Sequence, residues 1–201
     1  MRMKARYAGI DVGGRRKGFH AAGVSAREVV AGPERLANVK GVLQWLDALG
    51  PAVVALDSPM TCAPLGEGSR AAERALMKEI CGIRWTPDET KLAGNPYYEW
   101  IVCGRELYAA VERERARTGL EVIEVFPTAS WTVWAGPRGS VRRAGWTRGA
   151  LEGMALDGLP PRRLNQDDRD AIAAAITARL HAQGKSRTFG EIVVPTHSPA
   201  P

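Results

Sequence analysis

Aspartate residues stand at three places in the chain where their carboxylates can act together. Asp11 ends one short apolar run and Asp57 ends another, while Asp167 and Asp170 lie three residues apart before an alanine-rich stretch. Converging carboxylates can hold two divalent cations about 3.5 to 4 Å apart, one activating water and one stabilising a leaving oxygen. Hard oxygen ligands suit Mg²⁺ or Mn²⁺. The pattern therefore predicts metal-dependent phosphodiester chemistry.

Each carboxylate also has a simpler interpretation. Asp11 precedes two glycines and could begin a turn, and Asp57 precedes Ser-Pro and could be a loop residue that hydrogen-bonds its own backbone. Asp167 and Asp168 could be first-turn acids that the helix dipole favours, an explanation that suits Asp170 less well. The joint arrangement carries the prediction, in which the catalytic residues are Asp11, Asp57 and Asp170.

Glu124 is a further candidate ligand, because it alternates with Val122 and Val125 along an apolar run. Its side chain could equally point to solvent. The histidines are scattered without ligand spacing, so a structural role is expected for them. The predicted metal ligands are Asp11, Asp57, Glu124, Asp167 and Asp170.

Basic residues follow the first carboxylate and recur in the second half of the chain. Those after the glycine pair could meet a phosphate near Asp11, although a solvated hairpin turn explains them equally well. The tryptophans and arginines of residues 131–148 could stack on bases and bind phosphates, although such tryptophans are more often core or loop anchors. The predicted nucleic-acid-binding residues are Arg15, Arg16, Lys17, Arg142 and Arg143.

Composition restricts the class of protein. The 201 residues suffice for one sizeable core, and no apolar run approaches the roughly 20 residues of a membrane helix. The net charge of +6 favours an anionic partner such as DNA or RNA. Three widely spaced cysteines, with no secretion signal ahead of the first strand, predict a cytoplasmic protein with reduced thiols and no membrane partner.

The elements that must position the carboxylates begin with three short strands at residues 6–12, 19–24 and 27–31, which tight turns join into an antiparallel meander. A helix capped by Asn38 follows and stops at Gly50-Pro51. The apolar run from Ala52 to Leu56 is typical of a buried parallel strand. Asp11 and Asp57 are therefore expected at strand ends.

The rest of the chain predicts a helix, a long charged helix, a strand, a basic irregular insertion and a final helix, at residues 69–81, 97–117, 121–126, about 128–164 and 165–181. Either Asn165 or Asp167 caps the last helix, and its alanines let it approach the sheet closely. Glu191 to Val194 is a last strand or a tail packed on the sheet edge. Residues 1–195 form the one expected domain, followed by a flexible tail at 196–201.

This order of elements is that of the ribonuclease H-like fold, an α/β architecture. We expect a five-stranded mixed sheet, with the three-strand meander and two parallel strands, flanked by helices. The meander argues against a doubly wound dinucleotide-binding order, because that order would need a helical crossover directly after the first strand.

Several motifs together resemble the family called domain of unknown function 429. They are Gly9-Ile10-Asp11-Val12-Gly13-Gly14, Ala55-Leu56-Asp57-Ser58-Pro59, Arg70 with Glu73-Arg74, Trp85-Thr86-Pro87, Glu124-Val125-Phe126-Pro127 and Asp167-Asp168-Arg169-Asp170-Ala171. The resemblance extends from the first strand to Pro195. It implies a nuclease of the ribonuclease H-like fold, distantly similar to Holliday-junction resolvases.

The similarity to resolvases implies metal-ligand roles for Asp11, Asp167 and Asp170. The second acid of resolvases is a glutamate on the fourth strand. The residue nearest to that position in this sequence is Asp57, whose side chain is shorter by one methylene. Resolvases that cut both strands act as dimers, so the resemblance also implies a homodimer.

Three functions follow from these observations, led by a Mg²⁺- or Mn²⁺-dependent nuclease acting on DNA or RNA. A non-catalytic nucleic-acid- or protein-binding module of the same fold is the alternative. An actin-like ATPase or a kinase-related protein would use the Asp11 turn for phosphate, but it needs a second phosphate loop and a second domain, for which 201 residues leave little room.

Overall fold

The computed structural model describes residues 5–199, and a seven-stranded sheet of order β3-β2-β1-β4-β5-β7-β6 lies at its centre. The first three strands form an antiparallel meander, β1, β4, β5 and β7 run parallel, and β6 is antiparallel to β7. The strands are β1 (Tyr7–Val12), β2 (Phe19–Ser25), β3 (Glu28–Leu36), β4 (Val53–Asp57), β5 (Glu121–Val125), β6 (Ser186–Phe189) and β7 (Ile192–Pro195).

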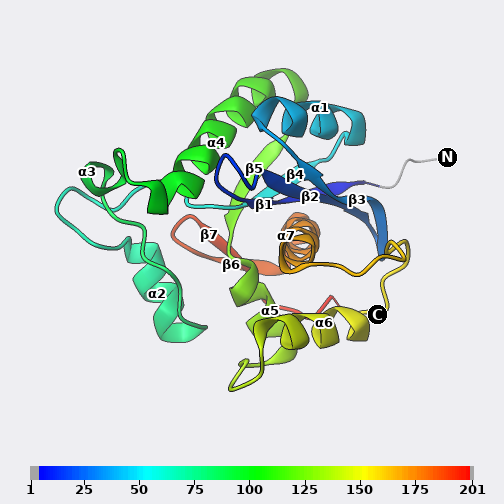
Figure 1. The fold of residues 1–201 in the computed structure, drawn as a ribbon. Coiled ribbons are helices and arrows are strands. Elements are labelled where there is room, and N and C mark those ends of the chain that lie inside the picture. The colour runs from blue at the N-terminus through cyan, green and yellow to red at the C-terminus, as the bar shows by residue number, and fades with distance from the viewer. Residues whose placement is uncertain (1–4, 200–201) are drawn as a thin grey trace.

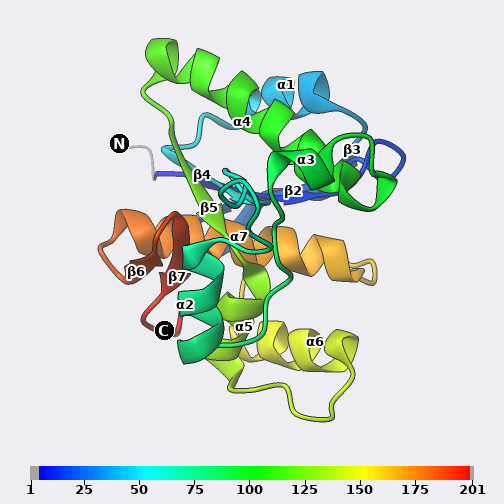
Figure 2. The ribbon, with the colours of Figure 1, turned by 90° about the vertical axis from the view of Figure 1, so that its left-hand side faces the viewer.

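Helices cover both faces of this sheet. They are α1 (Val39–Leu49), α2 (Ala71–Glu79), α3 (Glu89–Leu92), the 3-10 turn η1 (Pro96–Tyr98), α4 (Glu99–Thr118), α5 (Pro127–Ala135), α6 (Arg143–Gly153) and α7 (Gln166–Ala182). Figure 1 shows α1 and α4 on one face and α7 on the other, with α5 and α6 beyond α7. In Figure 2, α2 lies beside β6, β7 and α5, against which it packs. None of the helices in residues 5–199 is long and apolar enough to cross a membrane.

The predicted meander and parallel strands are confirmed, but the expected number of five strands was wrong. The two additional strands are the short hairpin β6–β7, which joins the sheet through pairing of β7 with β5. Four residues are too few for alternating burial to stand out in a sequence, and β6 buries only Phe189 well. Of the two alternatives for residues 191–194, the strand is the observed one.

The final helix α7 is buried on nearly all sides, because the sheet covers one side and α5 and α6 cover another. Its close approach to β1 depends on small residues. A Cβ atom on Gly9 would overlap the backbone of Ala171 and Ala175. The expectation that alanines bring this helix onto the sheet is confirmed, and Asp167 and Asp170 therefore come close to the end of β1.

The predicted irregular insertion at 128–164 contains two helices, α5 and α6. Pro127 suits the first turn of α5, and Trp131 and Trp146 are buried against α7. The core interpretation of these tryptophans is the correct one, and their burial is what makes the segment regular. Residues 196–199 of the predicted flexible tail lie along the molecule, where Trp134 Nε1 donates to the carbonyl of His197 at 3.1 Å. The rest of that tail lies outside the described residues.

Candidate active site

Asp11 and Asp57 are partners in the register of the parallel pair β1–β4, so they stand side by side at the carboxyl ends of two central strands. Open sheets bind ligands at this edge. Both side chains line a cleft of about 550 Å³ that Asp167 and Asp170 also line. We call it the carboxylate cleft. Residues far apart in the sequence thus meet where the sequence predicted.

The first turn of α7 divides its acids between two environments. Asn165 caps the helix by accepting from the backbone N–H of Asp168, and the Asp168 carboxylate accepts in return from Asn165 N–H at 3.0 Å. Asp168 also pairs with Arg162 at 2.6 Å and with His20 Nδ1 at 2.9 Å. Asp168 is therefore a capping and anchoring residue, whereas Asp167 and Asp170 face the cleft.

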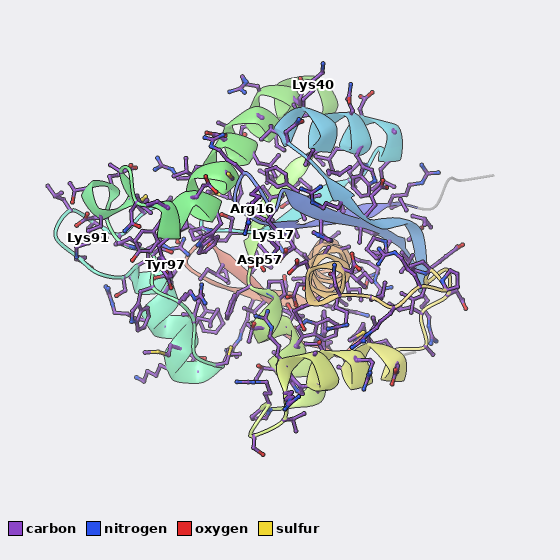
Figure 3. The ribbon with its side chains drawn as sticks, viewed as in Figure 1. Arg16, Lys17, Lys40, Asp57, Lys91 and Tyr97 are labelled. Carbon is purple, nitrogen blue, oxygen red and sulfur yellow. The ribbon has the colours of Figure 1, made fainter. Side chains whose placement is uncertain are left out.

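Two cations lie among the cleft carboxylates. The ammonium group of Lys17 is 2.9 Å from Asp167 Oδ1 and 3.5 Å from Asp11 Oδ2, and the guanidinium of Arg143 is 2.9 Å from Asp170 Oδ2. Figure 3 shows Lys17 and Asp57 together near the end of α7. Both cations are half exposed, so a phosphate entering the cleft can reach them.

The orientation of Asp170 depends on two donors that the sequence did not reveal as part of the site. Trp131 Nε1 donates to Asp170 Oδ1 at 2.9 Å, and Gln166 Nε2 donates to the same oxygen at 3.0 Å. Trp131 was expected only as a core anchor or a base-stacking residue. Its indole N–H can be recognised as a donor to Asp170 only when the packing of α5 on α7 is known.

Burial and mutual repulsion change the acidity of the cleft carboxyl groups. Burial raises the pKa of Asp11 to about 7, an effect that Lys17 opposes and that Asp170 and Asp167 reinforce. Burial also raises the pKa of Asp57 well above its usual range, with Asp11 as the next cause. The pKa of Asp170 is raised by burial in spite of Arg143. Such crowded acids are typical of a site that binds positive charge.

The side chains of the carboxylate cleft offer oxygen ligands of the kind that Mg²⁺ and Mn²⁺ prefer. Within residues 5–199, no three His, Cys, Asp or Glu side chains are grouped closely enough to hold a metal ion. Lys17 and Arg143 draw Asp167 and Asp170 toward themselves and supply the positive charge instead. The chemistry of these oxygen ligands fits a hard divalent cation, because buried carboxylates that raise one another's pKa would be stabilised by it.

Glu124 lines the same cleft but has other partners. Its Oε2 accepts from Arg70 Nη1 at 2.9 Å and from the backbone N–H of Met60 at 2.7 Å, and its Oε1 pairs with Arg70 Nη2. The prediction that Glu124 points either to a metal or to solvent did not anticipate this buried ion pair. Arg70 comes from the start of α2, far from Glu124 in the sequence.

The predicted nucleic-acid-binding residues do not form one patch around the cleft. Lys17 and Arg143 line it, whereas Arg15 is exposed and pairs with Glu106 on α4 at 2.7 Å. Arg16 is exposed in the turn that follows Asp11, and Arg142 is exposed at the start of α6. Their role in binding stays a prediction.

These features define a protein of the ribonuclease H-like fold, with the meander first, acidic residues at the ends of β1 and β4, and the last helix bringing further acids to the same edge. Solved structures of this class are similar to the chain. Thermus thermophilus RuvC in complex with a Holliday junction substrate matches with a TM-score of 0.51 and 16% identity, covering 90% of this chain and 96% of that one.

A second structure of Thermus thermophilus RuvC matches with a TM-score of 0.50 and 17% identity over 89% of this chain and 96% of that one. Likeness at this level of identity establishes the fold. No family model matches the sequence, and no curated protein matches it.

Proposed function

We propose that the protein is a divalent-metal-dependent nuclease that hydrolyses phosphodiester bonds of nucleic acid in the carboxylate cleft. The observation that carries the proposal is the pairing of Asp11 with Asp57 at the ends of neighbouring parallel strands, with Asp170 of α7 lining the same cleft. The similarity to resolvase structures supports this class of activity. The resemblance to domain of unknown function 429, which no family model shows, stays a prediction.

In this proposal Asp11, Asp57 and Asp170 would hold Mg²⁺ or Mn²⁺, with Asp167 as an additional ligand. These carboxylates are not grouped closely enough in the metal-free protein, so binding of the cation would have to draw them together. The bound cation would activate water and stabilise charge on the phosphoryl oxygens. Trp131 and Gln166 orient Asp170, and the raised pKa of Asp11 means that metal binding must displace a proton near neutral pH. Glu124 stabilises the cleft wall through Arg70 rather than binding the metal.

Lys17 and Arg143 are the groups that we propose contact the substrate's phosphates. Each is already charged and half exposed in the cleft, and each can exchange a carboxylate for a phosphate oxygen without leaving the site. The net charge of +6 assists association with a polyanion. The RuvC structure bound to a Holliday junction makes branched DNA one of the substrates to test. A homodimer stays a prediction.

The test is cleavage of single-stranded, duplex and four-way-junction DNA and of RNA with Mg²⁺, with Mn²⁺ or with EDTA. We expect metal-dependent products that fall at least about 100-fold in Asp11→Asn and Asp170→Asn, since even residues that only support metal ligands cost about 10- to 100-fold. Asp157→Asn is the matched control, because this aspartate is exposed and does not line the cleft.

Mn²⁺ binding, measured by calorimetry on the same variants, separates the alternatives. Cleavage that survives Asp11→Asn, or Mn²⁺ affinity equal in parent and Asp11→Asn, would contradict the proposal. Nucleic-acid binding without any cleavage would favour the non-catalytic module.

A further inference from the structure

An exposed aromatic ring lies next to a cation that lines the carboxylate cleft. Arg84 lines the cleft, and its guanidinium carbon lies 5.7 Å from the centre of the Tyr97 ring. The side chain of Tyr97 is conspicuously open for an aromatic residue, with 58% of its surface exposed. Figure 3 places Tyr97 on the α2 and α3 side of Asp57. We call this pair the Arg84–Tyr97 wall.

The backbone of Tyr97 is held by a turn, and its ring has one aromatic neighbour. It belongs to η1, where Asn95 Oδ1 accepts from the Tyr97 backbone N–H at 3.0 Å and Pro96 restricts the turn. Tyr98 packs its ring against that of Tyr97 at 4.9 Å in an edge-on arrangement. A rigid exposed ring loses little entropy when a flat partner stacks on it.

A buried polar network anchors the other half of the wall. Thr86 donates its backbone N–H and its hydroxyl to Glu73, Glu73 accepts from Arg70 at 3.0 Å, and Arg70 binds Glu124 on β5. Burying two carboxylates and a guanidinium is costly unless all are paired, as they are here. The network ties the segment with Arg84 to the strand next to β4. The motifs that contain Arg70, Glu73 and Thr86 therefore have a structural role, because they hold this segment against β5.

We propose that the Arg84–Tyr97 wall is a subsite for an unpaired nucleotide of the substrate, whose base stacks on the exposed Tyr97 ring beside Arg84 at the edge of the carboxylate cleft. The inference rests on the proposed nuclease function and deepens it. It assigns the enzyme to nucleic acids that have a single-stranded or unpaired position next to the phosphate that is cleaved. Aromatic rings flanked by arginine stack on bases of any sequence, so little sequence preference is expected.

The test is binding of a short fluorescent single-stranded DNA in EDTA, measured by anisotropy, against an abasic strand of equal length and against a duplex. Stacking of one base is worth about 1–3 kcal/mol, so Tyr97→Ala should weaken binding of the normal strand about 10-fold. Binding of the abasic strand and of the duplex should not change. Tyr97→Phe keeps the ring and should bind as the parent does.

Arg84→Ala has a matched control in Arg187→Ala. Arg187 lies 4.6 Å over the ring of Phe189 on β6, is half exposed, and does not line the cleft. Both variants remove one positive charge beside an aromatic ring. Arg84→Ala should weaken binding of the normal strand several-fold more than Arg187→Ala does.

The proposal is overturned if Tyr97→Ala weakens normal and abasic strands alike, if it leaves both unchanged, or if the parent binds neither strand. Because binding is measured without metal, its outcome is independent of cleavage. The expected binding pattern in a protein that cleaves nothing would retain the subsite and reject the nuclease. Cleavage by a protein whose binding does not depend on Tyr97 would retain the nuclease and reject the subsite.

Discussion

The carboxyl group of Asp11 is subject to two opposing influences. Burial and the negative charges of Asp170 and Asp167 favour its neutral form, while the ammonium of Lys17 favours the ionised form. The balance leaves its pKa at about 7, where a small change of surroundings decides its charge. A divalent cation or a phosphate that takes Lys17 away would therefore shift the protonation of the whole cluster.

The raised pKa predicts how the stability of the metal-free protein depends on pH. In the unfolded chain Asp11 titrates near its model value of 3.8, and in the folded protein at about 7. Between these values the folded state binds the extra proton, so the free energy of unfolding contributed by this group falls as pH rises through the window. Asp57 and Asp170, whose pKa values are also raised, act in the same direction.

The measurement is urea unfolding of parent and Asp11→Asn in EDTA from pH 4 to pH 8. We expect the stability of the parent relative to Asp11→Asn to decrease with pH up to about 7 and then to level off. Subtracting the unfolding free energy of Asp11→Asn from that of the parent cancels the contribution of groups whose titration changes stability in the opposite direction. Asp168 is such a group, since its pKa is lowered although burial opposes this. Asp157→Asn should run parallel to the parent. A difference that grows with pH would show that burial does not govern this carboxyl group.

Individual site residues could be predicted from the sequence to the extent that local patterns define them. Asp11 and Asp57 were expected in the site because an apolar run that ends in an acid marks a strand tip. The pairing of Glu124 with Arg70, and of Asp170 with Trp131, could not be predicted, because each joins segments whose packing no local pattern reports. Contacts of this kind depend on the sheet order and on the placement of α5.

Among the elements, α7 has the strongest effect on the site, because its distance from β1 decides whether Asp167 and Asp170 reach Asp11. Gly9 has no Cβ atom to separate the two backbones, and Ala171, Ala174 and Ala175 face it. The helix was predictable from its cap and its alanines. Helices α5 and α6 were not, since the glycines and arginines around them weaken every periodic signal.

Gly9→Ala tests the role of this close packing. The added methyl would overlap the backbone of α7 rather than a movable side chain, so the variant should lose about 3 kcal/mol of unfolding free energy. Urea unfolding with an unchanged slope would report this as a lower midpoint. Gly68→Ala, where no atom lies within 4 Å of the added carbon, should stay within about 0.5 kcal/mol of the parent. Equal stability of the two variants would mean that α7 can move away freely.

At the scale of the whole molecule, the net charge of +6 assists binding of a nucleic acid in the cleft only if some of the positive side chains lie near the cleft. Arg16 and Lys40 provide a comparison, since both are exposed and carry one charge. Figure 3 shows Arg16 beside Lys17 and Asp57, whereas Lys40 lies on α1 at the outer side of the molecule. General attraction of a polyanion would involve both, but a phosphate bound along the cleft mouth would contact only Arg16.

The salt dependence of single-stranded DNA binding distinguishes these cases. Each cation that neutralises a phosphate of a single strand contributes about 0.7 to the slope of log affinity against log salt concentration, because counterions are released. Arg16→Ala should therefore reduce the slope by about 0.7, and Lys40→Ala should leave it unchanged. Anisotropy titrations over a range of NaCl concentrations in EDTA give the slopes. Equal reductions in both variants would mean that the charge acts over the whole surface and that the turn after Asp11 does not guide the strand into the carboxylate cleft.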